Sequence, residues 1–195
     1  MYYDTLYLMN TLSDYASPKS KLTNMVKSGE IVRIRRGLYV KGGDYDKKSL
    51  ANMIYGPSYI SFEYALSWYG LIPERVEIVT SAVYNKNKDR EYNTPVGRFG
   101  YYYINPTVYP YSIVREVIDK EPFLIATKEK ALCDTLYKIK KTCRDHDVEA
   151  LLFDDLRIDE TELLTLNGKD VAMIAPLYGR RLIIQLSEYL KKRGK

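Results

Sequence analysis

The sequence predicts an α/β (α+β) fold in two parts, a small N-terminal domain of residues 1–45 and a larger C-terminal domain of residues 46–195. Three observations lead to this prediction. A helix, a glycine and a basic hairpin follow one another near the N-terminus, cations are concentrated in that segment, and strand-like and helix-like segments alternate over the rest of the chain. A chain of 195 residues is long enough for two small domains.

The first segment predicts two helices. Residues 3–15 carry apolar side chains at near-helical spacing. Ser17 and Pro18 then start a second helix, because serine is a favoured N-cap and proline is favoured at the first helical position. Gly29 ends that helix by the usual C-terminal glycine rule. The short connection leaves little room for a third helix, so either the first helix doubles as the support helix or a later helix completes the unit.

A basic hairpin follows the second helix. Residues 30–40 predict two short strands around a turn at Arg36 and Gly37. A helix, a glycine stop and a hairpin in this order are typical of the recognition helix and wing of a winged helix-turn-helix. We therefore predict a winged helix-turn-helix in residues 1–45 and place the domain boundary just after Gly42 and Gly43.

The larger domain is predicted to contain a small sheet flanked by helices. Apolar spacing and capping residues predict helices at residues 47–55, 61–69, 127–139, 148–153, 159–166, 170–177 and 181–193. Strands are predicted at residues 59–60, 75–82, 96–104 and 123–126. Residues 85–93 are polar and charged, which predicts the loop of a hairpin.

Charge and cysteine content narrow the class of protein. The formal net charge is +5, which is compatible with nucleic-acid binding, and seven of the cations lie in residues 17–41 beside a single acid, Glu30. Cys133 and Cys143 form neither a CxxC pair nor a disulfide framework, which indicates a reducing compartment. Because the chain shows no signal-like start and no apolar run of membrane length, we expect a cytoplasmic protein without membrane contact.

The second helix and the hairpin carry the candidate DNA-binding residues. If Leu22, Met25 and Val26 face inward, the opposite helix face presents short polar side chains and cations, the types that contact base edges and phosphates. The arginines of the hairpin would place a basic wing beside the groove. The candidates are Lys19, Ser20, Lys21, Thr23, Asn24, Lys27, Arg33, Arg35 and Arg36. The same pattern also fits a solvated helix face or a hairpin that docks on another protein.

Three segments of the chain, in the same order, are similar to those of one protein family. "LTNMVKSGEIVRIRRGLYV" resembles the N-terminal module of the AbiEi-type antitoxins and their predicted-regulator relatives, with its Lys-x-Gly helix end and R-G-x-Y turn. "YISFEYALSWYGLIPERVEIVTSA" resembles the helix and strand that follow in that family, and "IATKEKALCDTLY" resembles its "iAtpEKALlDll" segment. The third segment is the most specific of the three.

The resemblance implies a DNA-binding antitoxin of a type IV toxin–antitoxin system used in phage defence. It implies that the protein represses its own operon at an inverted repeat in double-stranded DNA. It also implies that the C-terminal domain counteracts a nucleotidyltransferase-like toxin, functionally rather than by direct contact. We expect a monomer or weak dimer that is not an enzyme and needs no cofactor and no metal. The alternatives are a protein-interaction module and a stand-alone transcriptional regulator without a toxin partner.

Other reactive side chains are weaker candidates. Glu129 and Lys130 leave a helix about 100° apart and share no face, so together with Asp134 they are expected to be structural or to contact a partner. His146, the only histidine, lies between two aspartates, and one histidine cannot make a zinc site without further ligands. Strand propensity accounts for the three consecutive tyrosines at 101–103. Cys133 is expected to be a small core residue of its helix.

Overall fold

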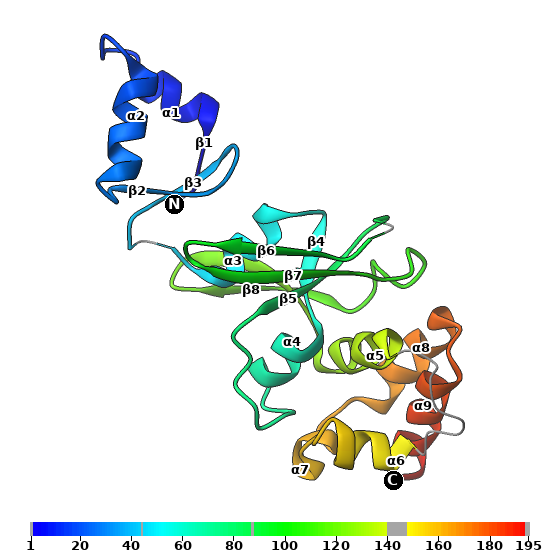
Figure 1. The fold of residues 1–195 in the computed structure, drawn as a ribbon. Helices are drawn as coiled ribbons and strands as arrows, with labels where there is room; N and C mark the ends of the chain where they lie inside the picture. The colour runs from blue at the N-terminus through cyan, green and yellow to red at the C-terminus, as the bar shows by residue number, and fades with distance from the viewer. Residues whose placement is uncertain (1, 44, 87, 140–147, 194–195) are drawn as a thin grey trace.

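The computed structural model describes residues 2–43, 45–86, 88–139 and 148–193 and has a mixed helix-and-sheet fold (Figure 1). A small N-terminal unit precedes a larger unit of sheet and helices, which confirms the predicted fold class. The N-terminal unit consists of β1 (Tyr2–Asp4), α1 (Thr5–Thr11), α2 (Pro18–Lys27), β2 (Ile31–Arg35) and β3 (Leu38–Lys41). The domain boundary at residue 45 stays a prediction.

Strand β1 takes the place of the first residues of the predicted helix 3–15. The small sheet has the order β1-β3-β2, so β1 pairs with β3 along one edge. Helix α1 starts only after Asp4, whose side chain accepts a hydrogen bond from the backbone N–H of Tyr7 at 2.7 Å. Pairing with a strand distant in the sequence therefore decides the conformation of Tyr3 and Asp4. Over the described residues 2–43, three strands and two helices make up the unit, and there is no third helix.

The small sheet is buried on both of its faces. Ile31 and Tyr39 pack with Leu8 beneath the two helices in a cluster of their own. Leu38 and Val40 belong instead to the main hydrophobic core of the larger unit, and Val40 is completely buried. Because successive residues of a strand point to opposite faces, Tyr39 and Val40 face the two different cores. The N-terminal unit is thus packed against the rest of the protein.

Strand β1 adds a polar contact between the two units. The Tyr2 hydroxyl donates a hydrogen bond to Oε2 of Glu121 at 2.8 Å. Burial raises the pKa of Tyr2 above its ordinary value, so this hydroxyl stays a donor at neutral pH. Tyr2 pairs with Val40 across the small sheet, which places this hydrogen bond on the sheet face that packs against the larger unit.

The larger unit is built on a six-stranded sheet in the order β6-β7-β5-β4-β9-β8. Strand β4 pairs in parallel with β9, strand β5 pairs in parallel with β7, and the other neighbours are antiparallel. The strands are β4 (Ser58–Ile60), β5 (Val79–Val83), β6 (Arg90–Thr94), β7 (Gly97–Tyr103), β8 (Ile113–Ile118) and β9 (Glu121–Ala126).

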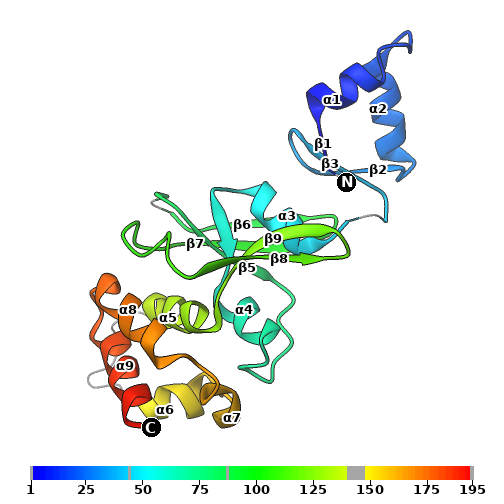
Figure 2. The ribbon, with the colours of Figure 1, turned by 180° about the vertical axis from the view of Figure 1, so that it is seen from behind.

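Helices cover both faces of this sheet. Helix α3 (Lys47–Ile54) lies on the face toward the N-terminal unit, and α4 (Phe62–Trp68) and α5 (Lys128–Lys138) lie on the other face (Figures 1 and 2). Beyond α5 follow α6 (Val148–Ala150), a π-helical turn (Leu151–Asp155), α7 (Glu160–Leu163), α8 (Gly168–Tyr178) and α9 (Arg181–Arg193). The predicted helices are confirmed in order, with shifted ends. No helix in the described part of the chain is long and apolar enough to cross a membrane.

The sequence patterns miss the two edge strands of the large sheet. Residues 85–93 are predicted as a loop, yet β6 begins at Arg90 and pairs with β7. Strand β8 pairs with β9 at the opposite edge. Edge strands carry polar residues on their exposed side and so lack the apolar run that marks a buried strand. The loop prediction is therefore wrong for residues 90–93. The predicted hairpin is wrong as well, because the flanking strands β5 and β7 pair in parallel.

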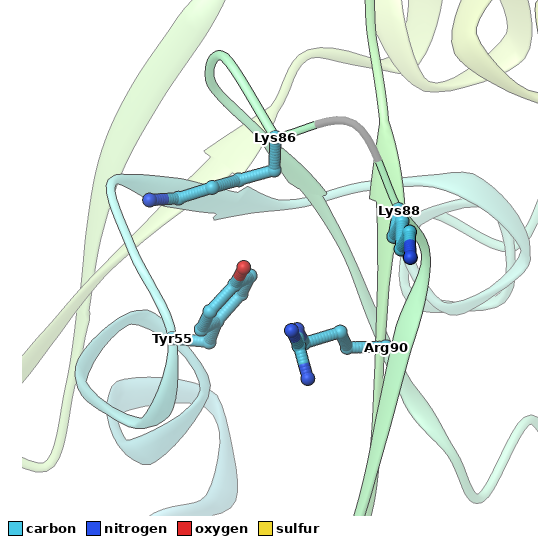
Figure 3. A pocket seen from close by; sticks show the side chains of 4 residues that line it. All are labelled: Tyr55, Lys86, Lys88 and Arg90. Carbon is cyan, nitrogen blue, oxygen red and sulfur yellow. The ribbon is translucent and has the colours of Figure 1, made fainter.

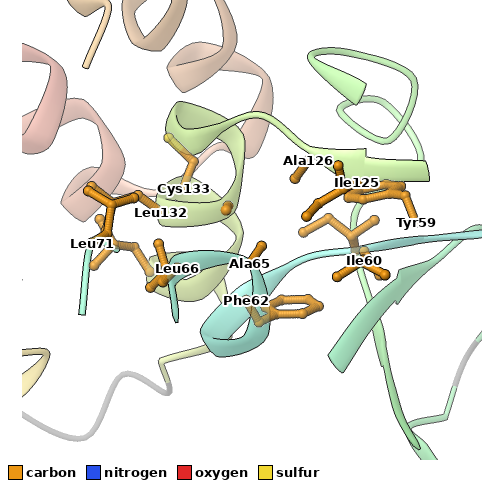
Figure 4. Close-up of a cluster of buried hydrophobic side chains, with 14 of the residues drawn as sticks. Tyr59, Ile60, Phe62, Ala65, Leu66, Leu71, Ile125, Ala126, Leu132 and Cys133 are labelled. Carbon is orange, nitrogen blue, oxygen red and sulfur yellow. The ribbon is translucent and has the colours of Figure 1, made fainter. Parts of the chain in front are cut away.

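Helices α4 and α5 pack against each other beside strands β4 and β9 (Figure 4). Phe62 and Leu66 of α4, Leu132 and Cys133 of α5, and Ile60 of β4 are all completely buried there. The prediction that Cys133 is a core residue is confirmed. Burial raises the pKa of its thiol well above the ordinary value, so the group is an inert apolar side chain.

A buried carboxylate, Asp134 of α5, joins four parts of the larger unit. Its Oδ2 accepts hydrogen bonds from the hydroxyls of Tyr59 at 3.0 Å and Ser61 at 2.7 Å, and its Oδ1 accepts one from Tyr178 at 2.5 Å. These donors come from β4, from the residue before α4 and from α8. Because a buried charge is costly without hydrogen bonds, the three hydroxyls compensate for the burial of Asp134.

Lys130 supplies the opposite charge to this network. Its Nζ lies 3.3 Å from Oδ1 of Asp134, and both side chains are completely buried. The same ammonium donates a hydrogen bond to the carbonyl of Val108 at 2.9 Å and lies 4.9 Å from the centroid of the Tyr178 ring. Burial lowers the pKa of Lys130, and the charge of Asp134 opposes that shift. The pair is closed to solvent, which supports a structural role.

Replacing Lys130 by methionine is expected to lower the free energy of unfolding by about 3–5 kcal/mol. The buried Asp134 carboxylate would lose its opposite charge and keep only hydroxyl partners. Urea denaturation of Lys130→Met and of the wild-type protein, followed by circular dichroism, measures the difference.

Lys128 is the matched control on the same helix. It is partly exposed, and its Nζ lies 3.3 Å from a carboxylate oxygen of Glu162. Exposed ion pairs contribute about 1 kcal/mol at most, so Lys128→Met is expected to change the free energy of unfolding by less than that. A loss in Lys130→Met no larger than the loss in Lys128→Met would contradict the role assigned to the buried pair.

The buried tyrosines predict a loss of stability in alkali. Burial raises the pKa of Tyr69 and of Tyr109 to about 12 from an ordinary value near 10. The folded state therefore holds these protons more tightly than the unfolded state, and this stabilisation is complete below about pH 10 and is lost as the pH rises toward about 12. We expect a lower free energy of unfolding at pH 11 than at pH 9, and a smaller difference in Tyr69→Phe. An identical difference in that variant would exclude Tyr69 as a contributor.

Candidate nucleic-acid interface

Helix α2 begins where the sequence predicts but is capped differently. Pro18 occupies the first helical turn, and Ser17 is the N-cap residue, yet the Ser17 side chain makes no cap hydrogen bond to the backbone. Its hydroxyl donates instead to the hydroxyl of Ser20 at 2.8 Å. The backbone N–H groups of the first turn are thereby left without a side-chain cap, which suits a helix end that receives a phosphate oxygen.

The predicted inward face of α2 is confirmed. Leu22 is buried, and Met25 and Val26 are half-buried against the cluster that contains Leu8 and Tyr39. These contacts fix the rotation of the helix about its axis, because residues three and four apart share one face.

The opposite face of α2 is open to solvent. Ser20, Thr23, Asn24 and Lys27 are all exposed, as is Lys19. The Thr23 hydroxyl donates to the carbonyl of Lys19 at 2.9 Å, which leaves the hydroxyl oxygen as an acceptor. Within the described ranges, the carboxamide of Asn24 has no hydrogen-bond partner. The face therefore offers one complete amide and two hydroxyls to a polar ligand.

The hairpin does not bring its three arginines onto one surface. Arg33 pairs with Tyr39, which faces α1 and α2, whereas Arg35 pairs with Leu38, which faces the larger unit. A β-bulge between Arg33 and Arg35 produces this change of side. Burial raises the pKa of Tyr101 in β7, and the charge of Arg35 opposes that shift, which places Arg35 on the side of the large sheet.

The hairpin turns at Arg36 and Gly37. Arg36 is exposed, and Gly37 adopts a φ of +85°. Only glycine takes this backbone conformation without strain, so Gly37 allows the tight connection between β2 and β3. The turn leaves Arg36 at the tip of the wing.

The six cations among the candidate DNA-binding residues carry uncompensated charge. Counting the described residues, none of the six forms an ion pair with a carboxylate. Lys21 is the one that is half-buried, and its Nζ lies 4.9 Å from the centroid of the Tyr15 ring. The six are Lys19, Lys21, Lys27, Arg33, Arg35 and Arg36.

The weaker candidates of the sequence do not form a second site here. Glu129 accepts a hydrogen bond from the backbone N–H of Asn167 at 2.8 Å, which fixes the start of α8. Tyr101 is buried and donates to the carbonyl of Ala51 at 2.6 Å, whereas Tyr103 is exposed. His146 lies outside the described residues. In the part of the chain that is described, no three His, Cys, Asp or Glu side chains gather as metal ligands.

Sequence reasoning misses a second group of cations, Lys86, Lys88 and Arg90, which line a pocket with Tyr55. They fall in the segment predicted as a polar loop. The signal that could have found them is the occurrence of three cations within residues 86–90, since only Arg90 lies in a strand.

One family model matches the chain. Residues 12–40 match the family described as "Transcriptional regulator, AbiEi antitoxin". The matched segment runs from the end of the α1 region through α2 and the hairpin, and it contains every candidate DNA-binding residue. The resemblance to the AbiEi antitoxin family is thus confirmed over this segment. No curated protein matches the chain.

Replacing Gly37 by alanine is expected to lower the free energy of unfolding by about 1–2 kcal/mol, the backbone cost of a left-handed residue with a Cβ. The new Cβ would meet no atom within 4 Å, so the cost is conformational and not steric. Gly168→Ala is the matched control, because Gly168 opens α8 without a positive φ and its Cβ would lie 3.7 Å from Cβ of Leu190. Thermal denaturation compares the two, and equal losses would exclude strain at Gly37.

Proposed function

We propose that this protein is a DNA-binding transcriptional regulator whose helix α2 enters the major groove of operator DNA. The observation that carries the proposal is the exposed, unpaired polar and basic face of α2, which lies within the segment that matches the AbiEi regulator family. Exposed cations without carboxylate partners bind phosphates by releasing the counterions of the duplex. The ion pairs of the larger unit show that cations elsewhere in the chain do find acidic partners.

The side chains of α2 and of the wing divide the work of recognition. Asn24 is suited to read an adenine through two hydrogen bonds in the major groove, and Ser20 and Thr23 add single hydrogen bonds. Lys19, Lys21 and Lys27 would contact phosphates on either side of the groove, and Arg33, Arg35 and Arg36 would act from the wing. Because Arg35 lies on the opposite side of the hairpin from Arg33, the proposed DNA-binding surface consists of the other eight residues, and Arg35 adds positive charge beside it.

From the family resemblance we further propose which operon the protein regulates and which kind of toxin it counteracts. The protein represses its own operon at an inverted repeat, and a two-fold repeat requires two copies of this monomer or weak dimer on the DNA. The larger unit then counteracts a nucleotidyltransferase-like toxin without direct contact, in phage defence within the cytoplasm. We propose a regulatory protein, with no catalysis and no cofactor.

A mobility-shift titration against the DNA upstream of its own gene tests the operator claim. The wild-type protein is expected to shift this DNA in the presence of unrelated competitor, with affinity falling steeply between 50 and 200 mM salt in the manner of phosphate contacts, by a factor of ~10 or more. Arg33→Glu/Arg36→Glu is expected to abolish the shift. Absence of a specific shift from folded wild-type protein would reject operator binding and favour a protein-docking role for the hairpin.

Lys191→Glu/Lys192→Glu is the matched control for charge. It makes the same change in net charge at two exposed lysines of α9, far from α2 in the fold (Figure 1). Binding is expected to stay close to that of the wild-type protein. An equal loss in both double variants would mean that net charge, and not the wing, governs binding.

Asn24→Ala separates base reading from phosphate contact. Loss of a bidentate base contact is expected to weaken specific binding by about 1–3 kcal/mol, which is a factor of about 5 to 150, and to leave non-specific binding unchanged. Competition titrations with operator and scrambled duplexes measure the two affinities. Equal weakening of both would assign Asn24 to the backbone and not to a base.

A separate experiment tests the proposal that the larger unit counteracts a toxin independently of DNA binding. Arg33→Glu/Arg36→Glu is expected to lose DNA binding and still protect cells that express the toxin encoded beside it, if the two units divide the labour. A folded variant that loses both functions would show that this division is wrong. An operator-binding protein without any toxin to neutralise would be a stand-alone regulator.

A further inference from the structure

A basic pocket lies between the end of α3 and the segment that joins β5 to β6. It is an open surface pocket with a volume of about 320 Å³, lined by Tyr55, Lys86, Lys88 and Arg90. Figure 3 shows Lys86 and Arg90 extending toward Tyr55 from different parts of this segment, with the tyrosine hydroxyl between them. We call this site the Tyr55 pocket.

The ring of Tyr55 organises the cations of the pocket. Nζ of Lys86 lies 5.5 Å from the ring centroid, and the guanidinium carbon of Arg90 lies 6.0 Å from it. The ring itself is held by Tyr92 and Tyr101, whose centroids lie 5.8 Å and 5.4 Å away. Cation–π attraction keeps the two charges near the ring, and the three packed tyrosines keep the ring in place.

The pocket holds positive charge without a compensating acid. Over the described ranges, none of its three cations forms an ion pair. The neighbouring acids point elsewhere, because Asp89 accepts a hydrogen bond from the backbone N–H of Tyr103, and Glu91 alternates with Arg90 along β6 and faces the other side of the sheet. Three cations that converge without a carboxylate attract an anion.

The chemistry of the pocket selects a phosphate group over a base. Lys86 and Arg90 already lie over the Tyr55 ring, so the ring is not free to stack on a planar ligand. Lysine and arginine that approach from several directions match the several oxygens of a phosphate.

The position of the pocket connects it with the N-terminal unit. Tyr101 packs against Tyr55 and bonds to the backbone of α3, the helix on the side of the sheet that faces the N-terminal unit. Arg35 of the wing acts on the same Tyr101, as its effect on the Tyr101 pKa indicates. The wing therefore lies within electrostatic range of the tyrosine that packs against Tyr55.

We propose that the Tyr55 pocket binds a backbone phosphate of the DNA that flanks the segment held by α2 and the wing. This inference rests on the proposed DNA-binding function and extends the DNA contact to the larger unit. Operator binding would then require a duplex longer than α2 and the wing alone would cover.

The test compares the salt dependence of binding to two duplexes. The shorter duplex carries only the DNA segment that α2 and the wing would contact, and the longer one adds flanking sequence on both sides. Wild-type protein is expected to show a log–log salt slope about one unit steeper on the longer duplex, because each phosphate contact contributes about one unit. Lys86→Ala/Lys88→Ala is expected to remove this difference and to leave binding to the short duplex unchanged. Lys191→Ala/Lys192→Ala, with the same change in net charge, is expected to keep it.

Three results would overturn the inference. Wild-type protein that binds both duplexes with the same slope would reject the flanking contact and leave the proposed function intact. A Lys86→Ala/Lys88→Ala variant that keeps the extra slope would do the same. If calorimetry detects wild-type binding of inorganic pyrophosphate that the variant loses, while both duplexes bind the two proteins alike, the pocket takes a free phosphate compound and not DNA. Failure of wild-type protein to bind any DNA would reject the proposed function itself.

Discussion

The buried pair of Lys130 and Asp134 is the interaction on which the larger unit depends. Asp134 accepts hydrogen bonds from hydroxyls that belong to β4, to the start of α4 and to α8, and Lys130 bonds to the carbonyl of Val108 after β7. Two charges buried in one core must satisfy each other, because either one alone would be costly. The pair therefore fixes where α5 lies on the sheet and which segments can approach it.

The small sheet holds the N-terminal unit in a defined position on the larger unit. One of its faces packs under α1 and α2, and the other, with Leu38 and Val40, joins the main core. A winged unit on a flexible tether would be free to turn, whereas burial of both sheet faces sets the direction in which α2 points. The proposed DNA surface and the Tyr55 pocket are consequently presented by one body, as the proposed flanking contact requires.

Lysine side chains serve opposite purposes at different places in the fold. Lys130 is completely buried beside Asp134 and stabilises the fold, whereas Lys27 and Lys88 are exposed and have no acidic partner among the described residues. The amino-acid composition does not distinguish these three lysines. The difference lies in burial and in neighbours, and those decide whether a charge is neutralised within the protein or is available to a ligand.

Local sequence patterns predict the order of the main elements, the inward face of α2 and the turn at Gly37, because caps, glycines and apolar periodicity act over a few residues. Only the tertiary structure decided that residues 2–4 form a strand, that Arg33 and Arg35 point to different sides, and that Lys86 and Arg90 meet at Tyr55. Each of these depends on pairing between strands or on a bulge within one. Such pairing joins residues far apart in the chain, and no local pattern records it.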